Sequence, residues 1–202
     1  MHGATIARLR ELLQTRAPNR LREAGTRSAA VLVPLAGPDG ELSLVCFERT
    51  HQVAEHKGEI CFPGGSVEPQ DADPVDAALR EAHEELGLPR ERVDVLGVLD
   101  DVHTTVSNYV ITPVVGHLDA LPALVPDPLE VARPVVVPLR DVMKPGAEGV
   151  EWRQWRGTRR QIYYYPVAGG RIWGATARIL HNLLTVWSGQ DAERSSRRER
   201  IR

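Results

Sequence analysis

The sequence is poor in cysteine, and this shortage excludes one class of protein. Only Cys46 and Cys61 occur among the 202 residues, and each lies in an apolar run typical of a strand. Small secreted domains that depend on disulfides carry far more cysteine than this. We therefore expect two buried, reduced thiols in a cytoplasmic protein, with a disulfide or a shared metal as the alternative.

Long apolar runs and a strong net charge are also missing. No run approaches the roughly 20 apolar residues that a membrane helix needs, and the N-terminus lacks the charged-then-apolar pattern of an export signal. The formal charge is −2, so nothing draws the whole chain to nucleic acid or to an anionic membrane. We expect one cytoplasmic domain with extensions, and neither a nucleic acid nor a membrane as its partner.

The most informative stretch covers residues 62–88. Its second half, 74–86, has the signals of an amphipathic helix, with Pro74 in the first turn and Gly87 just past the end. The apolar residues Ala82 and Leu86 can then face a core. The first half contains Pro63-Gly64-Gly65, a loop whose backbone can approach a phosphate or a metal closely.

Three glutamates fall on one face of this expected helix. Glu81, Glu84 and Glu85 lie at positions i, i+3 and i+4, so their carboxylates crowd together. Like charges at this spacing destabilise a helix, and we expect something outside the helix to compensate them. A divalent cation is the simplest candidate, because hard cations bind clustered carboxylate oxygens. The alternative is a glutamate-rich surface that is merely solvated.

Taken together, these residues resemble the Nudix box, the motif of hydrolases that cleave a nucleoside diphosphate linked to another group. The matching residues are Gly65, Arg80, Glu81, Glu84, Glu85, Gly87 and Leu88. In the usual box, seven residues separate a glutamate from the Arg-Glu pair, whereas here Asp71 replaces that glutamate and eight residues separate it from Arg80. Both departures fall in the loop, and Asp71 is assigned no role.

The resemblance implies a role for each residue of the glutamate face. Glu81, Glu84 and Glu85 would bind Mg²⁺ or Mn²⁺, and Arg80 would orient a glutamate by ion pairing. One carboxylate must deprotonate the attacking water, and the sequence leaves open which one.

Many members of the family carry a further catalytic or metal-binding glutamate in a loop far from the box. Glu130 is the position that matches here, with Asp100 and Asp101 as rivals. The structural alternative for Glu130 is a salt bridge at the edge of a loop.

The segment before the box, 44–65, resembles the coenzyme A pyrophosphatase branch of the family. The matching residues are Arg49, Thr50, His56, Gly58, Glu59, Phe62, Pro63, Gly64 and Gly65. Arg49 offers a planar fork suited to phosphate, and His56 and Lys57 add donors near the same loop. A surface ion pair for Arg49 and a structural hydrogen bond for His56 are the alternatives. With Gly64 and Gly65, these residues form the expected substrate-binding set.

The remaining sequence predicts a mixed α/β chain. Helices are expected at 5–16 and 175–187, strands at 29–36, 42–47, 93–99, 109–115 and 135–139, and a hairpin at 150–155 and 161–165. Polar residues at 103–108 and prolines at 118–129 indicate loops. One of the aromatic residues Tyr163, Tyr164, Tyr165 and Trp173 is a candidate for stacking on adenine, although core packing is the alternative.

The resemblance extends over about 29–184 and implies the Nudix fold, a mixed sheet between helices. We expect an N-terminal helix and connector at 1–28, the Nudix domain at 29–188 and a disordered tail at 189–202. The implied reaction cleaves coenzyme A into 4′-phosphopantetheine and adenosine 3′,5′-bisphosphate, with its acylated and oxidised forms as further candidate substrates. A Nudix enzyme for ADP-ribose or dinucleotides, or a non-catalytic nucleotide-binding module, is the alternative. Because dimers are frequent in the family, a homodimer is allowed.

Overall fold

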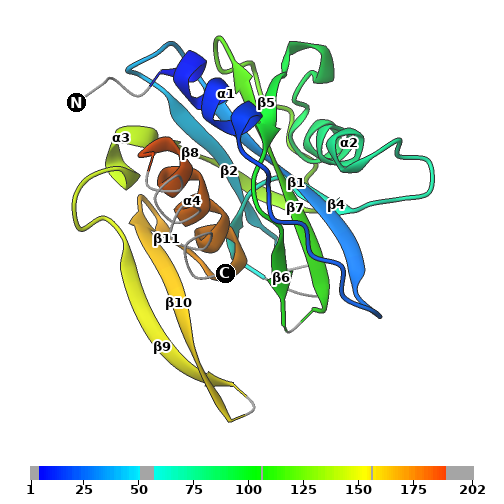
Figure 1. Cartoon of the computed structure of the whole chain (residues 1–202). Helices are drawn as coiled ribbons and strands as arrows, with labels where there is room; N and C mark the ends of the chain where they lie inside the picture. The colour runs from blue at the N-terminus through cyan, green and yellow to red at the C-terminus, as the bar shows by residue number, and fades with distance from the viewer. Residues whose placement is uncertain (1–4, 51–56, 106, 156, 190–202) are drawn as a thin grey trace.

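The computed structural model describes residues 5–50, 57–105, 107–155 and 157–189. Its strands form an eight-stranded mixed sheet and a separate three-stranded sheet (Figure 1). The strands are β1 Arg27–Ala36, β2 Ser43–Arg49, β3 Ile60–Cys61, β4 Gly64–Ser66, β5 Asp94–Val98, β6 Val102–Thr104, β7 Tyr109–Leu118, β8 Val131–Pro138, β9 Gly149–Trp155, β10 Thr158–Val167 and β11 Gly170–Trp173. The helices are α1 Ile6–Thr15, α2 Pro74–Leu86, the 3-10 turn η1 Arg90–Arg92, α3 Leu139–Val142 and α4 Gly174–Trp187.

Strand β1 is the centre of the large sheet. It runs parallel to β7 over its whole length, from the pair Arg27 and Tyr109 to the pair Ala36 and Leu118. Its other edge is shared, because β2 pairs with it only beside the turn and β4 pairs with it further along. The expected hairpin of 29–36 and 42–47 therefore exists at its turn, but the two strands then separate. The loop of the Nudix box enters the sheet where they separate.

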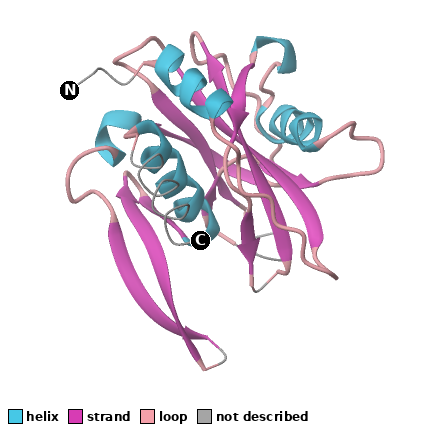
Figure 2. Ribbon diagram, viewed as in Figure 1, coloured by secondary structure: helices cyan, strands magenta, loops and turns pink. Residues whose placement is uncertain are grey.

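Helices cover both faces of the large sheet (Figure 2). Alternate residues of β1 belong to different cores, since Leu32 packs with the α2 side and Val33 with the α1 and α4 side. On one side, α2 contributes its buried alanines and Leu86. On the other side, Leu9 and Leu13 of α1 pack in the same core as α4. The sheet is thus sandwiched between helices, as the sequence predicted.

The helix α2 begins at Pro74 and ends before Gly87, as the sequence predicted, and both ends are capped. The side chain of Asp73 accepts hydrogen bonds from the backbone N–H groups of Val75 and Asp76, at 2.7 and 2.9 Å. At the other end Gly87 has φ +67°, a left-handed conformation that suits glycine, and its N–H reaches back to the carbonyl groups of Ala82 and His83.

Three predicted elements differ from the structure. The expected polar loop after Asp101 contains the short strand β6, which pairs with β7. The strand expected at 109–115 continues through Pro113 to Leu118, and the Pro113 carbonyl accepts a hydrogen bond from the Leu99 N–H at 2.9 Å. The strand expected at 135–139 begins at Val131, where it pairs with Arg49 of β2, and its last predicted residue, Leu139, starts α3.

The small sheet forms an arm that projects beside the large one (Figure 1). Its base is fixed to α4, since Glu148 contacts His181 Nδ1 at 2.6 Å and accepts a hydrogen bond from the Tyr165 hydroxyl. Tyr163 also stacks on the His181 ring, with 4.2 Å between the ring centroids. The arm therefore has a defined position relative to the helical layer.

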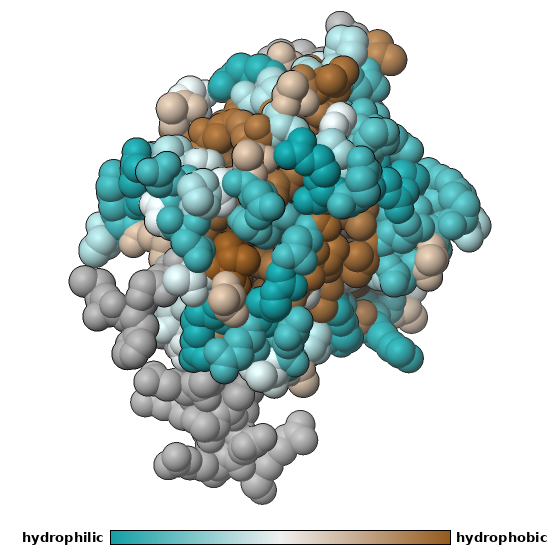
Figure 3. Space-filling view, turned by 90° about the horizontal axis from the view of Figure 1, so that it is seen from above, coloured by the Kyte–Doolittle hydropathy of each residue, from teal (hydrophilic) through white to brown (hydrophobic). Residues whose placement is uncertain are grey.

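The two cysteines do not form a disulfide with each other. Both Cys46 and Cys61 are free thiols, and burial raises the pKa of Cys61 to about 12. Seen from above, apolar side chains show between polar and charged ones (Figure 3). No helix in the described ranges is long and apolar enough to cross a bilayer.

Candidate active site

The three box glutamates project from α2 with very different exposure. The side chain of Glu85 is 3% exposed, that of Glu81 16% and that of Glu84 56%. The exposure of the three carboxylates therefore increases from Glu85, nearest the sheet, to Glu84, so the predicted glutamate face is not uniformly solvated. A buried carboxylate must find a partner or lose its charge.

Glu85 is the innermost of the three and touches the box loop. Its Oε2 accepts the backbone N–H of Gly64 at 2.8 Å, and its Oε1 lies 3.7 Å from Nη1 of Arg49. Burial outweighs both contacts and raises the pKa of Glu85 to about 8. This carboxyl is therefore short of positive charge in the structure as it stands.

The glycines of the loop make room for these carboxylates. A Cβ on Gly65 would come within 2.5 Å of Oε1 of Glu81, so any larger residue would displace that carboxylate. Gly64 has φ +155° and packs so closely on β1 that a Cβ would lie 2.4 Å from the carbonyl oxygen of Ala30. The loop was expected to approach a phosphate or a metal. In the structure, the Gly64 N–H binds Glu85, and the missing side chain of Gly65 leaves space for the Glu81 carboxylate.

Arg80 compensates the crowded charges from within the helix. Its Nη1 contacts Glu81 Oε1 and Glu84 Oε2, each at 3.0 Å. Its Nε and Nη2 bind the two oxygens of Asp71 at 2.9 and 3.1 Å. This guanidinium therefore offsets part of the charge of Glu81 and Glu84 from within the helix, whereas Glu85 meets Arg49 of β2 from outside it.

Asp71 gains a function that the sequence left unassigned. The guanidinium of Arg80 holds the pKa of this carboxyl below its usual value, and the Asp71 side chain is only 1% exposed. The fork-to-fork contact fixes Arg80 in one orientation. Asp71 therefore positions Arg80 despite the shorter side chain and the extra loop residue.

Glu130 and Arg49 meet the glutamate face from other parts of the chain. Nη2 of Arg49 lies 3.5 Å from Oε2 of Glu130, so this guanidinium stands between Glu130 and Glu85. The loop of Glu130 is held against the end of β2 by Thr50, whose N–H donates to the Glu130 carbonyl at 2.9 Å. The structure thus brings Glu130 to the box from a distant position in the sequence.

The rivals Asp100 and Asp101 lie elsewhere. Asp101 accepts hydrogen bonds from Arg20, from the N–H of Leu21 and from Thr112, and Asp100 pairs with Arg16. Both aspartates therefore fasten the N-terminal connector to the sheet.

Lys57, which also belongs to the expected substrate set, is not brought to the site. Lys57 lies in an exposed turn and is absent from the cavity wall. His56 lies outside the described residues.

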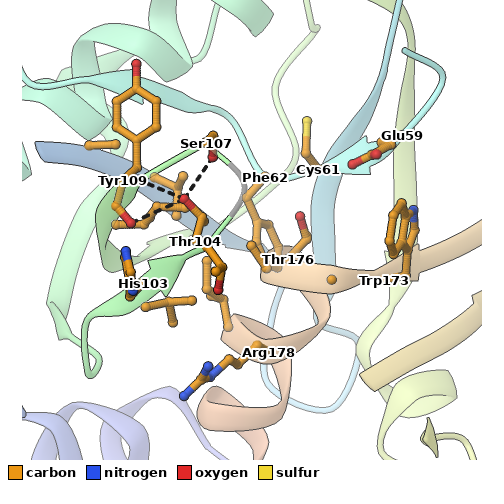
Figure 4. A pocket seen from close by; sticks show the side chains of 18 of the residues that line it. Glu59, Cys61, Phe62, His103, Thr104, Ser107, Tyr109, Trp173, Thr176 and Arg178 are labelled. Carbon is orange, nitrogen blue, oxygen red and sulfur yellow. Dashed lines mark hydrogen bonds between the residues drawn. The ribbon is translucent and has the colours of Figure 1, made fainter. Parts of the chain in front are cut away.

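A cavity of about 800 Å³ opens beside the box loop. Gly64, Gly65 and Arg49 form one side of it, and the arm and the start of α4 form the other. Figure 4 shows Glu59 and Cys61 at one end, with Thr104, Thr176 and Trp173 around the space between the elements. Tyr163 and Trp173 line this cavity, whereas Tyr165 is buried in the core.

Sequence reasoning missed most of the basic residues around the cavity. These are Arg27 of β1, Arg153 of β9, Arg160 of β10 and Arg178 of α4. Each of these arginines lies in a segment that the sequence analysis interpreted only as a connector, a hairpin or an amphipathic helix, with no binding role for its basic residues. Strand alternation could have separated Arg160 from its neighbour Arg159, but it could not show which face of the arm meets the cavity.

The carboxylates suit a hard divalent cation by their chemistry. Oxygen donors from aspartate and glutamate are what Mg²⁺ and Mn²⁺ bind, and burial raises the pKa of both Glu81 and Glu85. No three His, Cys, Asp or Glu side chains of the described ranges form a ready-made site, because Glu81 and Glu84 turn to Arg80. Glu84 is exposed enough to turn from Arg80 to a cation.

Comparison with known proteins agrees with this geometry. A model of the NUDIX domain matches residues 26–155. The chain is 35% identical to the uncharacterized Nudix hydrolase NudL of Photorhabdus laumondii, over 82% of this chain and 87% of that protein. It is also 35% identical to chloroplastic Nudix hydrolase 22 of Arabidopsis thaliana, over 86% of this chain and 58% of the relative.

Solved structures support the same assignment. RenU, a Nudix hydrolase from M. smegmatis, matches with a TM-score of 0.50 and 26% identity over 60% of this chain and 76% of its own. A MutT/nudix family protein from Enterococcus faecalis, at 13% identity, shares the fold with a TM-score of 0.55 over 83% of this chain and 62% of its own. The chain therefore belongs to the Nudix hydrolase family, whose members are pyrophosphohydrolases that generally use divalent metal ions.

Proposed function

We propose that the protein hydrolyses the diphosphate bond of coenzyme A. Water adds to one phosphorus atom, the bridging P–O bond breaks, and the products are 4′-phosphopantetheine and adenosine 3′,5′-bisphosphate. The observation that carries this proposal is the cavity beside the box loop, which is rich in arginine and is lined by half-buried aromatic side chains. The matching residues in the segment 44–65 support the same substrate.

The charge of the cavity suits a substrate with several phosphate groups. Five arginines line it, whereas Glu59 is the one carboxylate among its described lining residues. Coenzyme A carries a diphosphate and a separate phosphate on its ribose, and guanidinium groups bind such anions through paired N–H donors. The diphosphate would lie at the end where the cavity meets Gly64 and Gly65.

Trp173 is the aromatic residue that best suits the adenine ring. It lies on the cavity wall, half-buried, at the point where β11 ends and α4 begins (Figure 4). Tyr163 has one face already occupied by His181, so it offers less stacking surface. Base stacking on such a side chain contributes on the order of 1–3 kcal/mol.

Glu81, Glu84 and Glu85 would hold the metal ions of the reaction. A bound Mg²⁺ or Mn²⁺ supplies charge neutralisation for the diphosphate and activates the attacking water. Arg80 holds Glu81 and Glu84 on the same side of the helix, and Gly64 orients Glu85 through its N–H. Arg49, which lies beside Glu85 and Glu130, would contact the diphosphate.

Glu130 is the carboxylate that we assign to accept the proton of the attacking water. The other three are held by Arg80 or by the Gly64 N–H, whereas Glu130 has a single 3.5 Å contact with Arg49 from its side chain among the described residues. Its side chain is 45% exposed, so it can pass the proton to solvent.

Product analysis tests the proposal directly. The purified protein with Mg²⁺ or Mn²⁺ should convert coenzyme A to 4′-phosphopantetheine and adenosine 3′,5′-bisphosphate, as resolved by mass spectrometry. ADP-ribose and NADH at the same concentration serve as comparison substrates, because an enzyme for these compounds would share every box residue. Faster cleavage of either one would contradict the coenzyme A assignment and leave the Nudix assignment intact.

The pKa of Glu85 gives the metal site a defined pH dependence. Because the pKa of Glu85 is about 8 in the fold and near 4.5 in the unfolded chain, its protonation contributes to the free energy of unfolding of the metal-free protein in full below about pH 4.5. This contribution is lost as the pH rises to about 8. A divalent cation binds the ionised carboxylate and must displace a proton at lower pH. We expect 10 mM MgCl2, roughly a saturating concentration, to raise the Tm more at pH 8.5 than at pH 6.0. An equal or smaller rise at pH 8.5 would show that Glu85 does not bind the cation.

A further inference from the structure

We propose that Arg27, Arg160 and Arg178 form a binding site for a phosphomonoester group on the ribose of the substrate. This arginine cluster lies on the wall of the same cavity and would bind the group that distinguishes coenzyme A from its 3′-dephospho form. The inference rests on the proposed function, since it assigns the part of the site that reads the substrate away from the reacting diphosphate.

The three arginines share one cavity but come from three elements. Arg27 starts β1, Arg160 lies in β10 and Arg178 lies in α4. Residues so far apart in the chain are gathered by the tertiary fold. The three arginines therefore line one cavity because of the tertiary fold, and they do not form a basic run in the sequence.

The arginine cluster has no carboxylate partner within the described part of the chain. The two other arginines of the cavity do, because Arg49 pairs with Glu85 and Glu130, and Arg153 pairs with Glu151 at 3.2 Å. The whole chain carries more acidic than basic residues, so partners are not scarce. Three guanidinium groups without a carboxylate partner line one cavity, so an anion that enters it meets positive charge that no described carboxylate offsets.

Two members of the arginine cluster are held at the turn between β6 and β7. Arg160 Nη1 donates to Thr105 Oγ1 at 2.6 Å, and Arg27 Nη2 donates to the carbonyl of Ser107 at 3.2 Å. The Arg27 guanidinium also lies over the Tyr109 ring, 4.1 Å from its centroid. Their orientation is thus fixed before a ligand binds, which reduces the entropy lost on binding.

The same turn supplies hydroxyl groups that suit a phosphate. Thr104 and Ser107 share a 2.8 Å hydrogen bond, and both line the cavity with Thr105 (Figure 4). Glu59 lies beside Cys61, away from His103 and Tyr109 in the same view. The cavity therefore has a carboxylate near the box loop, Arg27 and Arg160 near the turn, and Arg178 on the wall formed by α4.

A phosphomonoester is the anion that fits these features. It carries a charge of about −1.5 to −2 at neutral pH and three terminal oxygens, so it can accept hydrogen bonds from several guanidinium groups at once. A diphosphate in the middle of a substrate would instead lie beside the metal-binding glutamates at the other end. The arginine cluster therefore selects nucleotides that carry a second phosphate on the ribose.

Binding of two nucleotides that differ by this phosphate tests the inference. Titration calorimetry of the wild-type protein should give a Kd for adenosine 3′,5′-bisphosphate at least tenfold lower than the Kd for AMP. In Arg160→Gln and in Arg178→Gln, this ratio should fall to less than about threefold, because one charged hydrogen-bonding contact with the ribose phosphate is lost. Arg178 has no hydrogen bond or ion pair among the described residues, so its replacement removes no structural contact seen there.

Arg159→Gln is the matched control. Arg159 is the neighbour of Arg160 on β10, points to the opposite face of the strand and lies over the Trp152 ring, outside the cavity. The change of charge is the same, so a general electrostatic effect would lower the ratio in all three variants and overturn the inference. The tenfold preference should survive in Arg159→Gln.

The binding measurement also separates this inference from the proposed function. A tenfold preference that depends on Arg160 and Arg178 establishes the site even if coenzyme A is not cleaved. Equal binding of the two nucleotides by the wild-type protein would refute the site, even if coenzyme A is the substrate.

Discussion

Replacing Glu85 with glutamine should lower kcat for diphosphate hydrolysis at least about 100-fold, because losing even an outer-shell partner of a metal costs 10–100-fold. Glutamine keeps the size of the side chain, and its carbonyl oxygen can still accept the Gly64 N–H that Glu85 accepts at 2.8 Å. The variant should therefore fold while losing the innermost negative charge of the site. Steady-state kinetics with saturating Mg²⁺ would measure the loss.

The same variant should gain relative stability in the absence of metal as the pH rises. Burial raises the pKa of Glu85 to about 8, so the wild-type fold loses stability between about pH 4.5, where the unfolded carboxyl ionises, and pH 8. Glutamine has no proton to release. The Tm of Glu85→Gln minus that of the wild type, measured in EDTA, should become more positive from pH 5 to pH 9.

Glu91→Gln provides the control for both measurements. Glu91 lies in η1 just past the same helix, is exposed and carries the same charge, but it is not on the glutamate face. Its replacement should change kcat by less than about twofold, as surface substitutions usually have small effects. If Glu85→Gln retained wild-type activity, the metal assignment would be wrong, whatever its effect on stability.

The sequence predicted the helix of the box well because its signals are local. Asp73, Pro74 and Gly87 define the ends of α2 through contacts within a few residues. The spacing of the three glutamates fixes their shared face in any α-helix. These features need no knowledge of the rest of the fold.

The partners of those glutamates depend on tertiary contacts, and the sequence could not supply them. Arg80 can reach Asp71 only because the preceding loop folds back along the helix. Glu130 reaches Arg49 because Thr50 fastens the distant loop to β2. The graded burial of the glutamates likewise depends on where the box loop enters the sheet between β1 and β2.

The arginines of the cavity were missed for a related reason. Alternation along β10 shows that Arg159 and Arg160 point to opposite faces, but both faces of an isolated hairpin look alike in sequence. The contact between Arg160 and Thr105 spans 55 residues. Only the position of the arm against α4 and the large sheet decides which arginine meets the cavity.

Arg80→Lys should lower kcat by about 10–100-fold, although it keeps the positive charge, the range seen when residues that orient metal ligands are lost. The guanidinium binds both oxygens of Asp71 through Nε and Nη2, and its Nη1 simultaneously contacts Glu81 and Glu84. An ammonium group is a compact charge on a flexible chain and cannot reproduce this fork. Glu81 and Glu84 would then repel each other and spread apart.

Arg90→Lys separates this geometric effect from a general preference for arginine. Arg90 of η1 pairs with Asp76 of α2, both side chains are substantially exposed, and neither pairs with a box glutamate within the described residues. Exposed pairs contribute little, so we expect less than about a twofold change in kcat. Equal losses in both variants would mean that α2 needs its salt bridges for stability. A loss confined to Arg80→Lys would mean that the fork holds the glutamates where the cations bind, and that Asp71 sustains the Nudix box of this chain despite its altered spacing.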